Sequence, residues 1–195
     1  MSAQPHRLMH ALIHPRSATS VTAIGAVSVA FAAIVPWTLS ESWWLEAGVA
    51  LALAFAWLAA ATDAETGRIP DRLVLLASVP TVAVMCLSVL SGHPDAVVRV
   101  VVGLIAFAAP LLVVHVVSPS ALGFGDVKLA AALGAAIGLV DPRSAVLALC
   151  VASAATALVA LARRRSAMAF GPGLVFGAAV SLVAFGASSG RPVPW

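Results

Sequence analysis

Long runs of apolar residues alternate with short polar segments along most of the chain. The runs cover residues 17–38, 44–62, 73–90, 97–117, 129–140, 145–162 and 169–187. A helix rises about 1.5 Å per residue, so about 20 apolar residues cross a hydrocarbon core of about 30 Å. Most runs have this length, and the run 129–140 is shorter. The pattern predicts an all-α fold, a polytopic transmembrane helix bundle of about six to seven spans.

Composition favours a membrane protein and excludes a soluble one. Hydrophobic residues make up 62% of the 195 residues and charged residues only 10%, whereas a soluble domain usually has about 25% charged residues. The length leaves room for spans and short connections, so we expect one membrane-embedded domain over residues 1–195, with 1–16 as a short cytoplasmic N-terminal segment. The run 17–38 could also be the hydrophobic part of a signal peptide, but its length favours a retained span.

The basic residues between the runs indicate the orientation of the chain. With a cytoplasmic N-terminus, eight Lys and Arg residues lie on the cytoplasmic side and three on the opposite side. The eight are Arg7, Arg16, Arg68, Arg72, Lys128, Arg163, Arg164 and Arg165, and the three are Arg99, Arg143 and Arg191. Because such an excess is typical of cytoplasmic loops, we predict a cytoplasmic N-terminus. Topology explains the net charge of +3 better than nucleic-acid binding does.

Two acidic residues stand at the ends of apolar runs, where a carboxylate near lipid costs about 3 kcal/mol or more. Asp126 lies in the sequence GFGDVK at 123–128, just before the run 129–140, and Asp63 directly follows the run 44–62. The predicted orientation places both residues at the cytoplasmic face, where they can meet. We therefore interpret them as parts of one functional site.

Two neighbouring carboxylates in a poorly solvated place do not both ionise readily, so the pair shares one proton. The ionised member acts as a base toward water, and the protonated member polarises a peptide carbonyl. Gly123 and Gly125 lack side chains and tolerate unusual dihedral angles, so the backbone there can approach a substrate strand closely. In an alternative interpretation, Asp126 is a helix N-cap and Lys128 an interfacial residue with its stem on apolar surface.

Other polar positions have structural interpretations. Asp71 follows a proline and precedes an apolar run, as a helix N-cap does. His115 lies near the end of the run 97–117 and is interpreted as a packed or hydrogen-bonded histidine. Gly171, Pro172 and Gly173 would interrupt the last run, and backbone opened at membrane depth usually lines a cavity. The alternative for these three is the start of a helix at the interface.

Neither the cysteines nor the histidines predict a metal site. Cys86 and Cys150 lie inside apolar runs, and the sequence has no CxxC motif, so we interpret them as inert thiols of the core. His6, His10 and His14 recur every four residues, but two prolines interrupt this stretch and no carboxylate accompanies it. We predict no bound metal.

Three motifs together resemble the type IV prepilin leader peptidase family, whose members are GxGD intramembrane aspartyl proteases. The motifs are D-x5-IP at 63–70, GFGDVKL at 123–129 and FGPG at 170–173, and the resemblance extends over residues 44–187. It implies that Asp63 and Asp126 are the catalytic pair of an aspartic endopeptidase. Around them we expect substrate-binding or site-shaping roles for Pro70, Gly123, Gly125, Lys128, Gly171 and Pro172.

The same resemblance implies a substrate, a location and a chemistry. It implies cleavage of the basic leader from type IV pilin-like or Flp-type precursors at the cytoplasmic face of a bacterial cytoplasmic membrane, without a cofactor. The partners would be these precursors and membrane lipids. Longer members of the family carry a cysteine-rich region with paired CxxC motifs and also methylate the new amine. This sequence lacks such motifs, so it resembles a short form with the peptidase core alone.

Two other classes of function remain open from the residues themselves. A small proton-coupled transporter would also combine intramembrane carboxylates with helices interrupted by Gly and Pro. The sequence has no internal repeat and no acid near the middle of a run, and both observations count against that class. A structural assembly protein would leave Asp63 and Asp126 without a role.

Overall fold

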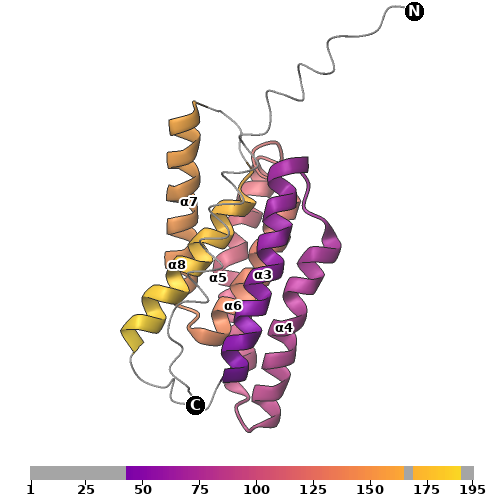
Figure 1. Ribbon diagram of the computed structural model, residues 1–195, viewed down its shortest axis with the longest axis vertical. Helices are drawn as coiled ribbons and strands as arrows, with labels where there is room; N and C mark the ends of the chain where they lie inside the picture. Colours follow the sequence, from indigo (N-terminus) through magenta and orange to yellow (C-terminus); the bar gives the residue numbers. More distant parts are fainter. Residues whose placement is uncertain (1–42, 165–168, 190–195) are drawn as a thin grey trace, which may run out of the picture.

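The computed structural model describes residues 43–164 and 169–189, which form six helices (Figure 1). They are α3 (Trp43–Thr66), α4 (Asp71–Leu90), α5 (Asp95–Val117), α6 (Phe124–Val140), α7 (Ser144–Arg163) and α8 (Gly171–Ser189). These ranges contain no strand, so the predicted all-α fold is confirmed for them. The six helices correspond to six of the seven apolar runs. The run 17–38 and the segment 1–16 lie outside the described residues.

Helix α6 is the centre of the described bundle. It contacts each of the other five helices, and most of its residues are buried. Its 17 residues rise only about 25 Å, which is less than the hydrocarbon thickness. The shortest apolar run of the sequence is therefore the helix that the others enclose.

Glycines allow α5 and α6 to pack closely. A Cβ atom at Gly103 would overlap the backbone of Gly134 and Gly138, and one at Gly138 would overlap the backbone of Arg99. Small residues at facing positions are the usual means by which membrane helices approach one another. This contact fixes α6 against α5 and so limits where the first turn of α6 can lie.

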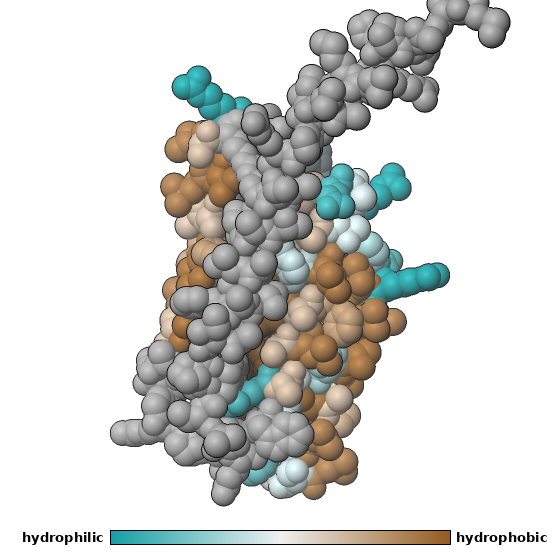
Figure 2. Space-filling view, in the orientation of Figure 1, coloured by the Kyte–Doolittle hydropathy of each residue, from teal (hydrophilic) through white to brown (hydrophobic). Residues whose placement is uncertain are grey.

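The outer surface of the bundle is largely apolar. Large aliphatic side chains point outward, among them Leu75 and Leu90 on α4, Val98 on α5 and Leu158 on α7, and Figure 2 shows broad apolar areas along the sides of the molecule. Four helices, α3, α4, α5 and α7, are long and apolar enough to cross a membrane, whereas the apolar part of α8 is shorter. These features indicate a multi-pass membrane protein. The total number of spans and the side of the N-terminus stay predictions.

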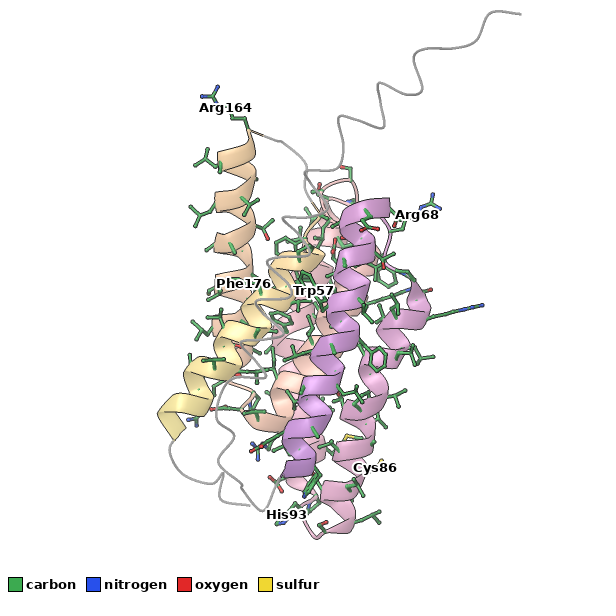
Figure 3. All side chains as sticks on the ribbon, in the orientation of Figure 1. Trp57, Arg68, Cys86, His93, Arg164 and Phe176 are labelled. Carbon is green, nitrogen blue, oxygen red and sulfur yellow. The ribbon has the colours of Figure 1, made fainter. Side chains whose placement is uncertain are left out.

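The two cysteines correct one prediction from the sequence. Cys86 on α4 and Cys150 on α7 are exposed, and Figure 3 shows Cys86 at the side of α4. Their interpretation as core thiols is wrong. A membrane helix is apolar all round, so apolar neighbours in the sequence do not distinguish a side chain that faces the core from one that faces lipid.

Two of the basic residues used in the orientation argument lie at one end of the bundle. Arg68 and Arg164, which we assigned to the same side of the membrane, lie at the same end of the molecule, and His93 lies at the opposite end (Figure 3). The α3–α4 connection, which contains Arg68, therefore marks the end of the bundle where the acidic residues are expected.

Candidate active site

Asp63 lies in the last turn of α3 and is only 8% exposed. The helix ends just after it because Gly67 has a φ of +67°, in the left-handed region that glycine adopts without strain. The N–H of Gly67 donates to the carbonyl oxygen of Asp63 at 2.8 Å. The local sequence thus places this carboxylate at a helix end.

Asp126 lies in the first turn of α6 and is also 8% exposed. The helix begins at Phe124, Gly123 is its N-cap residue, and the N–H of Asp126 donates to the carbonyl oxygen of Gly123 at 3.1 Å. The alternative interpretation of Asp126 as an N-cap is therefore wrong. Its side chain does not close the helix and is directed into the bundle, because α6 is enclosed by the other helices.

The start of α8 brings Gly171 to both carboxylates. The backbone N–H of Gly171 is directed at Asp63 and at Asp126, and the two carboxylates interact electrostatically. A Cβ atom at Gly171 would lie 3.2 Å from Oδ2 of Asp63. The first N–H groups of a helix lack partners within it and carry partial positive charge. Three helix ends that are distant in the sequence therefore meet at one place, at the upper end of the bundle in Figure 1.

One oxygen of each carboxylate lacks a partner. Oδ2 of Asp63 and Oδ1 of Asp126 are buried and accept no hydrogen bond from the residues that the structure describes. Buried polar atoms are nearly always hydrogen-bonded, and an unpaired one is costly. Unpaired oxygens of this kind on two interacting carboxylates suit the binding of water or of a polar substrate group.

Neither glycine of the GxGD motif has unusual dihedral angles, and a Cβ atom would be crowded at Gly125 but not at Gly123. Gly123 has φ −70° and ψ 145°, which any residue adopts, and Gly125 is helical. Our expectation of special dihedral angles there is wrong. Gly125 instead packs against Ile69, and a Cβ atom at Gly125 would lie 3.1 Å from Cβ of Ile69. This contact joins the motif to the α3–α4 connection.

The start of α4 is also joined to α6, through Asp71 and Lys128. Pro70 is the N-cap residue of α4, so Asp71 is the first helical residue and not the N-cap that we predicted. Asp71 instead pairs with Lys128, whose Nζ atom lies 2.8 Å from Oδ1 of Asp71. Lys128 is therefore held by an acid of α4, and its interpretation as a purely interfacial residue does not describe its contacts.

The glycines and proline at the start of α8 do not interrupt a helix. α8 begins at Gly171, so the predicted break is wrong and the alternative, the start of a helix, is confirmed. Pro172 is the second residue of α8, and proline is accepted in a first turn because those N–H groups have no partner within the helix. Gly173 faces away toward α7, where a Cβ atom would overlap the side chain of Thr156.

His115 contacts the GxGD segment in a way that we did not predict. Its Nδ1 atom lies 2.8 Å from the carbonyl oxygen of Leu122, and its ring lies 5.4 Å from the ring of Phe124. The interpretation as a packed or hydrogen-bonded histidine is confirmed, but its partners could not be read from the sequence, because they depend on the path of the loop between α5 and α6.

The described residues contain no group of three or more His, Cys, Asp and Glu side chains placed to hold a metal ion. His6, His10 and His14 lie outside the described residues.

A sequence profile described as the Type IV leader peptidase family matches residues 50–161. The matched region includes Asp63 and Asp126 but ends before Gly171. No curated protein and no solved structure gives a significant match. The matched region covers more than half of the chain, and the chain belongs to the type IV leader peptidase family.

Proposed function

We propose that this protein is a membrane aspartic endopeptidase that removes the basic leader of type IV pilin-like or Flp-type precursors at the cytoplasmic face of a bacterial membrane. The observation that carries the proposal is the meeting of two buried carboxylates, Asp63 and Asp126, beside the backbone N–H of Gly171. Family membership supports a leader peptidase type of protease. The proposal concerns peptide cleavage alone and does not include methylation.

The proposed mechanism uses the carboxylates in opposite protonation states. The ionised carboxylate takes a proton from water, and the water oxygen attacks the carbonyl carbon of the scissile peptide. The protonated carboxylate donates its proton to the carbonyl oxygen, which gives a tetrahedral diol. The diol then collapses: the ionised carboxylate takes a proton from one diol hydroxyl, the protonated carboxylate gives its proton to the departing nitrogen, and the C–N bond breaks. The pair ends with one proton, as it began.

The place of the site suits a substrate that is itself anchored in the membrane. Asp63 and Asp126 lie at one end of the bundle, and α4 and α5, which pack in the same bundle, expose large apolar side chains on their outer surfaces. A precursor with a basic leader followed by an apolar helix would keep its helix in lipid and its leader in water. The scissile bond then lies at the boundary, at the depth of the two helix ends.

The test is cleavage of a fluorescent precursor of this design by purified enzyme in lipid vesicles. Asp63→Asn and Asp126→Asn are each expected to lower the rate by a factor on the order of 10³ or more, because members of a catalytic pair act as a unit. Asp95→Asn is the matched control, because Asp95 is an exposed acid on α5 and should keep the wild-type rate.

Either Asn variant keeping more than a few per cent of the rate, with normal insertion into the membrane, would contradict the assignment of the pair. A proton-coupled transporter is the other class to test. It would show loss of proton flux in both variants without any cleavage by the wild type.

A further inference from the structure

We infer that His115 is a positioning residue of this peptidase and that it holds the turn before Asp126 through a hydrogen bond from Nδ1–H. The inference rests on the proposed function, since it concerns the placement of a carboxylate that we propose to be catalytic. His115 itself is in the last turn of α5. In the described structure it contacts Leu122 and Phe124 and makes no hydrogen bond with either carboxylate, so it acts through the backbone of the turn.

The direction of the hydrogen bond follows from its partner. The acceptor is the carbonyl oxygen of Leu122, 2.8 Å from Nδ1, and a carbonyl cannot donate. Nδ1 of His115 must therefore carry a hydrogen. The bond links the last turn of α5 to the residue that precedes Gly123, so it closes the α5–α6 connection directly at the start of the GxGD motif.

A second contact of His115 fixes the residue on the other side of Gly123. Its ring packs at a tilt against the ring of Phe124, with 5.4 Å between centroids. Lys128 lies over the same Phe124 ring at 5.2 Å, within the range of a cation–π contact. His115 thus holds both neighbours of Gly123, and Gly123 is the N-cap of the helix that carries Asp126.

These contacts matter because glycine gives the turn little stiffness of its own. Gly123 and Gly125 flank Phe124, and glycine loses more conformational freedom on folding than any other residue. A turn of this composition needs external contacts to keep Asp126 facing Asp63. Since α6 is central and already packed, loss of the His115 contact should shift the first turn of α6 and leave the rest of the helix in place.

The experiment compares His115→Asn with His115→Gln in the vesicle cleavage assay. The amide nitrogen of Asn takes the place of the His115 Nδ1 atom. The longer Gln side chain places its amide nitrogen near the position of the His115 Nε2 atom. His115→Phe keeps an aromatic ring without a donor, and Val116→Ala controls for substitution at an exposed neighbour on the same turn. Thermal unfolding of each variant in lipid separates misfolding from misplacement.

We expect kcat to fall about ten-fold in His115→Gln and His115→Phe with KM little changed, whereas His115→Asn and Val116→Ala stay within about three-fold of wild type. Equal rates for the Asn and Gln variants would overturn the inference, as would a full wild-type rate for His115→Phe. If His115→Phe does not fold, the comparison of His115→Asn with His115→Gln still tests the inference. A wild-type enzyme that does not cleave the precursor would overturn the proposed function, whereas the pattern among the variants tests His115 alone.

Discussion

Replacing Gly171 by alanine tests whether the start of α8 belongs to the active site. The new Cβ atom would lie 3.2 Å from Oδ2 of Asp63 and 3.5 Å from Cα and Cβ of Ala60. Non-bonded heavy atoms prefer a separation of about 3.5–4.0 Å, so the Ala60 contacts are acceptable and the Asp63 contact is too close. The methyl group and the carboxylate must separate by a few tenths of an ångström.

The cost of that separation falls on the carboxylate. Turning Asp63 about 30° from a preferred rotamer costs about 0.5–1.5 kcal/mol, which is about two- to twelve-fold in rate when the active arrangement requires the original rotamer. Misplacement of a reacting group by 1 Å costs up to about 100-fold. We therefore expect Gly171→Ala to reduce kcat about ten-fold, while the fold is kept, because one displaced side chain is a small change for a packed bundle.

Gly123→Ala is the matched control. A Cβ atom at Gly123 would lie 3.6 Å from Oδ2 of Asp126, an ordinary contact, and the φ of −70° there suits alanine. This variant should stay within about three-fold of wild type. The measurement is kcat and KM for precursor cleavage in lipid vesicles, with thermal unfolding as the check on folding. A folded Gly171→Ala enzyme with the wild-type rate, or a larger loss in Gly123→Ala, would refute the steric reasoning.

Three further predictions use the same assay. The cleavage rate should have a bell-shaped dependence on pH, because both carboxylates are protonated on the acid limb and both are ionised on the alkaline limb. A rate that is flat from about pH 4 to 9 would contradict proton sharing. Asp71→Lys and Lys128→Asp should each lower the rate, and the double variant should recover part of it. The ion pair is exposed and worth only about 0.2–1 kcal/mol, so the melting temperature should change little. A double variant that is slower than both single variants would count against the pairing. Chelators should leave the rate unchanged, as should the exposed substitutions Cys86→Ala and Cys150→Ala, whereas inhibition by EDTA that zinc reverses would exclude the proposed mechanism.

The helices could be predicted from the sequence because runs of apolar residues are a strong signal. Six runs correspond to the described helices, and the helix ends differ by a few residues where Gly67 and Gly171 set them. The sequence also indicated that Asp63 and Asp126 are unusual, because a carboxylate next to lipid is costly. It could not show that α6 is enclosed by the other helices, since all the helices are apolar on every side.

Contacts across the site could not be predicted for a related reason. The pairs Gly125 with Ile69, Lys128 with Asp71, and His115 with Leu122 join segments whose spacing follows no helical period. Each depends on how two connections fold over the end of the bundle. For Asp71, the sequence indicated a helix start correctly, but the proline before it already served as the N-cap, so the acid was left to pair with Lys128.

Two kinds of contact determine where Asp126 lies, and their energies assign them different roles. The close packing of α5 on α6 at Gly103, Gly134 and Gly138 leaves no room for a side chain, and overpacking of such a contact costs about 1–3 kcal/mol or more. The contacts of Lys128 and His115 are single hydrogen bonds or exposed ion pairs worth about 1 kcal/mol each. The glycine contact therefore holds the fold, and the polar contacts adjust the first turn of α6 within it. Substitutions that change activity without loss of the folded protein should consequently occur around the GxGD turn and not along the α5–α6 contact.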